Sequence, residues 1–194
     1  MDSSFLLNLE VKKYDNPWSY YVIDNFLPSE SFKKLQQQLC AVDAGFEKQD
    51  DDIFQINFMF LPDLTLAKFF IGEAFQEFLQ RVTQKSLEIS DTGLVQLRRM
   101  TPNSPAMPPH IDAADERSLV CIYYLSPNWH PQCGGELLLH PDNLRISRQE
   151  AVAIEPLANR MVLFFTDNTN WHSVVKVNNW NRYSVLSEWI VQEG

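Results

Sequence analysis

Residues 118–140, SLVCIYYLSPNWHPQCGGELLLH, contain the pattern from which the fold of this chain can be predicted. An apolar run rich in β-branched and aromatic side chains gives way to proline, asparagine and glycine, and a second short apolar run follows. Runs of this length between turn residues are typical of buried strands, because a helix usually needs about ten or more residues to bury one face. The stretch therefore predicts two strands joined by an irregular connection.

The same pattern continues on both sides of this stretch, from Gly93 to the end of the chain. The further β-rich runs are LVQLRRM (94–100), AVAIEP (151–156), RMVLFFT (160–166), WHSVVKV (171–177) and RYSVLSEWIV (182–191). About seven closely spaced strands favour two sheets packed face to face. We predict a jelly-roll or cupin-like barrel, also called a double-stranded β-helix.

Helical signals come before this β-rich region. A strand is predicted over residues 20–26, and the sequence Pro28-Ser29-Glu30 predicts the start of a helix. A second, continuous helix is predicted from about Leu64, with an apolar stripe formed by Ala67, Phe70, Ala74, Phe78 and Val82. We therefore expect one α+β, mostly β, domain over residues 1–194. Its N-terminal support covers about 1–92, with the helices packed on one sheet, and its catalytic barrel core covers about 93–192.

Composition argues against several classes of partner. The chain has 16 basic and 25 acidic residues, a formal charge of -9, and no run of lysine or arginine, so no nucleic-acid partner is expected. The three cysteines form no CxxC pair, and the N-terminal apolar stretch is too short for a signal peptide or a membrane span. These features predict a cytoplasmic protein without membrane association, and they leave its oligomeric state open.

Two histidines and one aspartate form a candidate metal site. His110 and Asp112 are two positions apart, so in extended backbone their side chains point to the same face. An HxD pair alone is weak evidence, since a solvated loop end after two prolines would look the same. His172, at the start of another predicted strand, completes the ligand set of a facial triad, which leaves coordination positions open on a non-haem iron(II) ion.

Arg182 and Ser184 lie on one face of the last predicted strand, because they too are two positions apart. A guanidinium group can hold a carboxylate through two hydrogen bonds, and the serine hydroxyl can add another donor. Taken alone, Arg182 is better interpreted as a surface residue on an edge strand. Beside the triad, the pair suits the distal carboxylate of 2-oxoglutarate, whose 2-oxo acid end would chelate the iron.

From about Tyr20 to Val191 the chain resembles the prolyl-hydroxylase-like branch of the iron(II)- and 2-oxoglutarate-dependent dioxygenases. The branch includes hypoxia-inducible-factor and ribosomal-protein prolyl hydroxylases. The resemblance rests on VIDNFLPSE, HID, CIYYLSPNWHPQCGGELLLH, RMVLFFTDNTNWHSV and NRYSVLSEW. It implies Fe(II), 2-oxoglutarate as cosubstrate and O2, with ascorbate as a candidate reductant.

The resemblance also implies roles for individual residues. His110, Asp112 and His172 would be the catalytic iron ligands. The cosubstrate-binding residues would be Arg182 with Ser184, Tyr124 as a phenol donor to the same carboxylate, and Ile122 and Leu137 along the channel. For Tyr124, an ordinary core aromatic is an equally good reading.

Two positions depart from related sequences. Near the end of the LVQLRRM strand, where these hydroxylases usually present a tyrosine to the cosubstrate, this chain has Met100. Either Arg98 or Gln96 faces that space, or the cosubstrate makes one contact fewer. The nucleic-acid demethylases of the superfamily carry a second arginine six residues after the anchoring one, where this chain has Glu188.

The function predicted from these features is hydroxylation of a substrate with release of succinate and CO2. The resemblance favours a prolyl residue of an intracellular protein or peptide. A free amino acid or other small metabolite is the alternative, because substrate choice depends on loops, and the acidic segment Gly45–Phe60 is either a lid over the substrate or a solvated loop. A non-catalytic cupin-like metal-binding protein is a different class, and it would not require Arg182.

Overall fold

The computed structural model describes residues 3–50, 55–90, 95–112, 118–142 and 149–192. Within these ranges the helices are η1 (Ser4–Asn8), α1 (Ser29–Leu39), α2 (Leu64–Phe70), α3 (Glu73–Thr83) and η2 (Pro131–Cys133). The strands are β1 (Lys12–Tyr14), β2 (Tyr20–Ile23), β3 (Glu47–Asp50), β4 (Gln55–Phe60), β5 (Leu87–Ile89), β6 (Gln96–Met100), β7 (Met107–His110), β8 (Ser118–Tyr124), β9 (Leu137–Leu139), β10 (Val152–Ile154), β11 (Met161–Phe165), β12 (His172–Val174) and β13 (Arg182–Val191). None of these helices is both long and apolar enough to cross a membrane.

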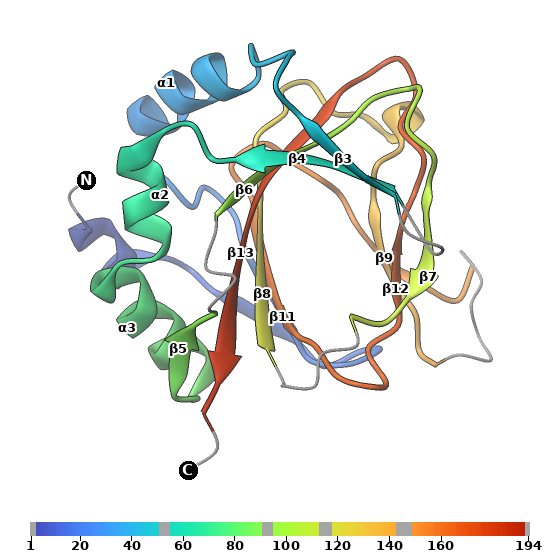
Figure 1. Cartoon of the computed structure of the whole chain (residues 1–194). Coiled ribbons are helices and arrows are strands. Elements are labelled where there is room, and N and C mark those ends of the chain that lie inside the picture. The colour runs from blue at the N-terminus through green and yellow to red at the C-terminus, as the bar shows by residue number, and fades with distance from the viewer. Residues whose placement is uncertain (1–2, 51–54, 91–94, 113–117, 143–148, 193–194) are drawn as a thin grey trace.

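The strands form two antiparallel sheets that face each other (Figure 1). The larger has the order β1-β2-β11-β8-β13-β6-β4-β3, with β5 also paired to β13, and the smaller has the order β10-β9-β12-β7. All three α-helices lie on the outer side of the larger sheet (Figure 1). This arrangement is the double-stranded β-helix predicted from the short β-rich runs.

Alternation along β8 divides the core into two apolar clusters. Leu119, Cys121 and Tyr123 belong to the cluster beneath the helices, whereas Ile122 and Tyr124 belong to the cluster between the sheets. Both faces of β8 are therefore buried, which explains why its sequence is apolar throughout rather than alternating with polar residues. The helices support the outer face of the larger sheet, and its inner face is left to form a cavity.

The prediction of one continuous helix from about Leu64 is wrong, because the chain forms two helices, α2 and α3, with a break between them. Gly72 lies between α2 and α3 and is the N-cap of α3. A Cβ atom at position 72 would lie 2.8 Å from the carbonyl oxygen of Lys68, closer than side chains tolerate. The break changes which residues are buried: Phe69 and Phe75 join the core, while Val82 on the predicted stripe is only partly buried.

Several strands were not predicted from the sequence, namely β1, β3, β4, β5 and β7. The predicted loop Gly45–Phe60 contains the β3–β4 hairpin, and β4 extends the larger sheet by pairing with β6. Asp51 and Asp52 of its acidic stretch lie outside the described residues. Strand β7 contains two prolines, which lack a backbone N–H donor. The sheet tolerates them because β7 lies at its edge, where one side of the strand has no partner strand to bond. The strand predicted over 20–26 ends earlier, at Ile23.

Candidate metal centre

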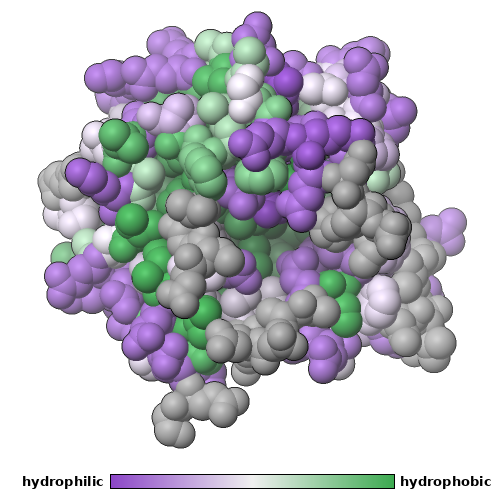
Figure 2. All heavy atoms as spheres, viewed as in Figure 1, coloured by the Kyte–Doolittle hydropathy of each residue, from purple (hydrophilic) through white to green (hydrophobic). Residues whose placement is uncertain are grey.

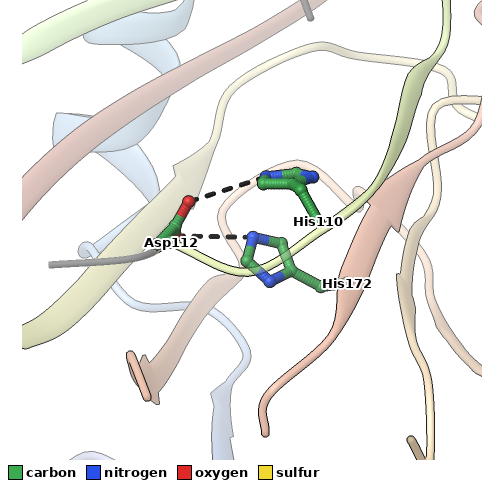
Figure 3. A group of neighbouring side chains, drawn as sticks. All are labelled: His110, Asp112 and His172. Atoms are coloured by element: carbon green, nitrogen blue, oxygen red, sulfur yellow. Dashed lines mark ion pairs between the residues drawn. The ribbon is translucent and has the colours of Figure 1, made fainter. Parts of the chain in front are cut away.

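His110, Asp112 and His172 come together in the structure. His110 ends β7 and His172 begins β12, and the two residues are direct partners in the smaller sheet. Asp112 follows two residues after His110, and Figure 3 shows the three side chains converging from these two neighbouring segments. Their potential ligand atoms all lie within 4.8 Å of one another. The structure therefore places all three predicted ligands around one point.

Both histidines present the same ring nitrogen to this point. His110 Nε2 lies 3.6 Å from Asp112 Oδ1, and His172 Nε2 lies 3.4 Å from Asp112 Oδ2. The other ring nitrogens donate to backbone carbonyls: His110 Nδ1 to Pro108 at 2.8 Å and His172 Nδ1 to Asn170 at 3.0 Å. Because a carbonyl oxygen can only accept, the proton of the neutral ring sits on Nδ1 and the lone pair remains on Nε2. Each imidazole is thus oriented as a metal ligand.

The electrostatics of the cluster favour the protonation states that a metal requires. Burial, together with the neighbouring His172, lowers the pKa of His110 and favours the neutral ring. Burial alone would raise the pKa of Asp112. A histidine of the cluster that carries a proton on Nε2 stabilises the Asp112 carboxylate, His172 more than His110, and the charge of Arg98 adds to this effect. Together these interactions outweigh burial, so the pKa of Asp112 is lowered and the carboxylate is ionised. Two neutral imidazoles and one carboxylate fit a divalent ion such as iron(II).

A cavity of about 490 Å³ lies beside the three candidate ligands, between the two sheets. Figure 2 shows a hollow near the middle of the molecule, with hydrophobic surface inside it and hydrophilic atoms along part of its rim. Its apolar walls include both predicted channel residues, Ile122 and Leu137, and also Phe164, whose ring packs edge-on against His172 with centroids 5.1 Å apart. This volume is in the usual range for sites that bind small molecules, about 300–1,000 Å³.

Arg182 brings a buried cation to this cavity. Its side chain is 5% exposed, its Nη1 donates to Ser184 Oγ at 3.4 Å, and its guanidinium carbon lies 4.9 Å from the centre of the Tyr124 ring. Among the described residues, no carboxylate pairs with Arg182, and neither its Nε nor the buried Tyr124 Oη has a hydrogen-bond partner. A buried charge without a counterion is costly, so this part of the site fits a ligand carboxylate.

Gly135 allows the chain that leads into β9 to pass close to Arg182. A Cβ atom at this position would lie 3.2 Å from Arg182 Cδ and 3.0 Å from Val177 Cγ1, and the glycine has a φ of +81°. The preceding Gly134 is more restricted still, since a Cβ atom there would lie 2.1 Å from the carbonyl oxygen of Lys176. The double glycine therefore helps to shape the site as well as the turn.

Arg98 shares the wall of the cavity with Met100. Both residues line the cavity, and Met100 lies directly opposite Arg182 in the larger sheet. Gln96 supports this arrangement, because its Oε1 accepts a hydrogen bond from Arg98 Nε at 2.9 Å. Arg98 therefore lines the cavity, and Gln96, which does not line it, holds the Arg98 side chain by this hydrogen bond.

Glu188 also lines the cavity, and sequence reasoning did not assign it to the site. It follows Arg182 and Ser184 on the same face of β13, so strand alternation was the signal that could have found it. The segment Gly45–Phe60 reaches the cavity as well, through Gln55, Ile56 and Asn57 of β4.

Comparison with known proteins gives consistent matches. The 2OG-Fe(II) oxygenase superfamily matches residues 95–190, which include His110, Asp112, His172 and Arg182. The chain is 24% identical to the prolyl 3-hydroxylase OGFOD1 of Mus musculus over 170 residues, which cover 84% of this chain and 30% of that protein. It is 34% identical to the prolyl hydroxylase EGLN3 of Mus musculus over 68 residues, covering 34% of this chain and 27% of that protein. The chain thus spans less than a third of the length of these curated relatives.

A solved structure has the same architecture. It is a prolyl hydroxylase from Trichoplax adhaerens in complex with a peptide fragment of the hypoxia inducible factor oxygen degradation domain. The two chains superpose with a TM-score of 0.67 at 22% identity, over 89% of this chain and 83% of the other. At this identity the likeness shows a shared fold.

Proposed function

Because this chain is a prolyl-hydroxylase-like member of the 2-oxoglutarate- and iron(II)-dependent oxygenases, we propose that it hydroxylates a prolyl residue of a polypeptide. One observation carries the proposal: His110, Asp112 and His172 converge beside a cavity lined by a buried arginine to which the described residues provide no counterion. A cupin-like protein that only stores or senses a metal would gain nothing from Arg182, and such a buried cation would be a cost to its stability.

Different residues of the site would hold the metal, bind the cosubstrate and exclude solvent. Nε2 of His110, Nε2 of His172 and the carboxylate of Asp112 would hold iron(II) and leave part of its coordination sphere free. When bound, iron(II) with 2-oxoglutarate and O2 supplies the oxidising chemistry: one oxygen atom enters a substrate C–H bond, the other ends in succinate, and CO2 is released. The backbone carbonyls of Pro108 and Asn170 keep both imidazoles oriented throughout.

Arg182 would pair with the distal carboxylate of 2-oxoglutarate. Ser184 accepts a hydrogen bond from the guanidinium, and Tyr124 places beside it a phenol group to which the described residues supply no hydrogen-bond partner. The apolar side chains of Ile122, Leu137 and Phe164 exclude water along the cavity, which strengthens the charge pair at its end. These roles are consistent with one dicarboxylate bound between Arg182 and the metal ligands.

The prolyl substrate is supported by the names of the matched relatives, and the polypeptide by the Trichoplax adhaerens enzyme, which was solved with a peptide. Proline has no backbone N–H, so an extended prolyl segment can enter a narrow apolar cavity without leaving that donor unsatisfied. We further infer a cytoplasmic location, because all three cysteines are free.

The test measures succinate formed from 2-oxoglutarate by the purified protein with iron(II), first alone and then with cell extract and prolyl peptides. Mass spectrometry then locates a gain of one oxygen on proline. Asp112→Ala, prepared in the same way, is the matched control. The proposal would be refuted if the wild-type protein formed no more succinate than this variant in any of these conditions. A gain of oxygen on a free amino acid, with none on any polypeptide, would refute the polypeptide substrate.

A further inference from the structure

Glu188 lies at the opposite end of the cavity-facing side of β13 from Arg182. Positions 182, 184, 186 and 188 alternate onto one face of the strand, and all four residues line the cavity. At about 3.3 Å per residue, the backbone positions of Arg182 and Glu188 are roughly 20 Å apart, much longer than 2-oxoglutarate. A cosubstrate held at Arg182 therefore leaves the region around Glu188 to the substrate.

Buried hydroxyl groups hold the Glu188 carboxylate in position. Ser118 Oγ donates a hydrogen bond to Glu188 Oε1 and lies 3.0 Å from Thr166 Oγ1, which in turn accepts from the Ser118 backbone N–H at 2.9 Å. Ser118 and Thr166 are 2% and 3% exposed. Among the described residues, Oε2 of Glu188 has no hydrogen-bond or ion-pair partner. One oxygen is thus fixed from behind, and the other can accept a ligand.

Among the described residues, a cation that shares the cavity with Glu188 forms no ion pair with it. Arg98 lines the same cavity, but its Nε donates to Gln96 Oε1 at 2.9 Å, and within the described residues no ion pair joins it to Glu188. Burial lowers the pKa of Arg98 to about 10, partly offset by the charges of Asp112 and Glu188 and reinforced by Arg182. The positive charge of Arg98 therefore interacts electrostatically with both Asp112 and Glu188.

We propose that Glu188 binds a cationic group of the substrate, an ammonium or a guanidinium, and thereby determines substrate specificity. The inference rests on the proposed function and narrows its substrate class. An oriented carboxylate with a free acceptor stabilises a cation by a charge-assisted hydrogen bond and repels an anion at the same place. Two sources supply this chemistry: a lysine or arginine next to the hydroxylated residue of a polypeptide, or the α-ammonium group of a free amino acid.

The test compares three labelled peptides of equal length in which one proline is flanked on both sides by lysine, glutamine or glutamate. Fluorescence anisotropy measures the binding of each peptide to protein loaded with Mn²⁺ and 2-oxoglutarate. Mn²⁺ replaces iron(II) so that the peptide binds without being hydroxylated. The variants are Glu188→Gln and Glu188→Lys. Glu88→Gln is the control, because it makes the same change of charge at an exposed position of β5, outside the cavity.

We expect the wild type and Glu88→Gln to bind the lysine peptide about tenfold or more tightly than the glutamate peptide. Glu188→Gln should reduce this preference to about threefold or less, and Glu188→Lys should reverse it. Competition with free L-lysine and L-proline separates the two sources. Displacement of the label by L-proline, whose only cationic group is its α-ammonium, assigns the cation to an α-ammonium group, whereas displacement by L-lysine alone assigns it to a side-chain ammonium.

Two results would overturn the inference. One is a wild-type protein that shows no preference among the three peptides and no displacement by either amino acid. The other is a preference that stays the same in Glu188→Lys. Because these are binding measurements, they do not depend on turnover. Absence of succinate formation by the iron-loaded wild type would instead count against the proposed function.

Discussion

His110 and His172 show how single hydrogen bonds set the chemistry of a side chain. Each ring is fixed by a backbone carbonyl at Nδ1, and for that reason each turns Nε2 toward Asp112. The acceptors come from residues two positions earlier in the chain. Strand β7, and β12 with the residues just before it, therefore each carry a candidate ligand together with the group that orients it. The triad is therefore assembled from two local units.

Replacing Asp112 with alanine should weaken binding of Mn²⁺ or iron(II) by at least about 100-fold, because the only anionic ligand is lost. Anaerobic calorimetric titration measures the effect. Asp43→Ala, at an exposed position, changes the charge equally and should leave metal affinity intact. Equal affinities in the two variants would show that the metal is held elsewhere.

Replacing Arg182 with alanine should weaken binding of 2-oxoglutarate by about 2 to 5 kcal/mol, as expected when one member of a buried charge pair is removed. Arg182→Lys keeps the charge but not the bidentate geometry, so its affinity should be intermediate. Metal affinity should change little in either variant. Calorimetric titration of the Mn²⁺-loaded proteins with 2-oxoglutarate measures these affinities. Unaltered binding in Arg182→Ala would show that Arg182 does not bind the cosubstrate.

At the scale of elements, the path of the chain into β9 determines whether Arg182 can occupy its place. Gly135 combines a positive φ with close contacts to Arg182 and Val177, so the glycine is required for both backbone and site. Gly72 has a comparable role between α2 and α3, where a side chain would collide with the preceding turn. Both positions couple a local backbone requirement to the packing of a neighbouring element.

Gly135→Ala should destabilise the fold by about 1 to 3 kcal/mol and also weaken 2-oxoglutarate binding, because the new methyl group displaces Arg182. Gly45→Ala is the matched control: Gly45 also has a positive φ, of +83°, but the nearest atom to its added Cβ is Met59 Cε at 3.7 Å. Urea denaturation and cosubstrate titration are measured on both. Weakened binding in Gly45→Ala to the same extent would mean that general strain, not contact with Arg182, is responsible.

For the whole molecule, the buried histidines make stability depend on pH. Burial is the main cause that lowers the pKa values of His110 and His140 from the ordinary 6.5, with His172 adding to it in both cases. As pH falls below about 6.5, the unfolded chain therefore takes up protons that the folded protein resists. Asp112, whose pKa is also lowered from 3.8, adds a second loss of stability below that value.

The metal-free protein should accordingly lose stability on acidification from about pH 7 to about pH 5. Urea denaturation at a series of pH values measures this, and His140→Asn should show a shallower dependence. Mn²⁺ should raise stability most near neutral pH, since protons and metal compete for the same nitrogens. Stability that increases toward pH 5 without metal would contradict the assigned protonation states.

The sequence was sufficient for the fold class and for the members of the triad. Short apolar runs between turn residues reflect burial on sheets, a property of local pattern, and they predicted β6 and β8 to β13. HxD with a distant histidine and arginine predicted which side chains belong together, because ligand types follow from metal chemistry. The two-position spacing of Arg182 and Ser184 likewise places both on one face of any strand.

Tertiary structure decided what local pattern could not. The break at Gly72 depends on a contact with the preceding turn, and β7 forms despite its prolines because it pairs only with β12, at the edge of a sheet. Glu188 and Arg98 enter the site because the inner face of the larger sheet borders a cavity there instead of packed core. Alternation along a strand assigns residues to two faces, but only the packing of distant elements determines which face encloses space and which charges share it.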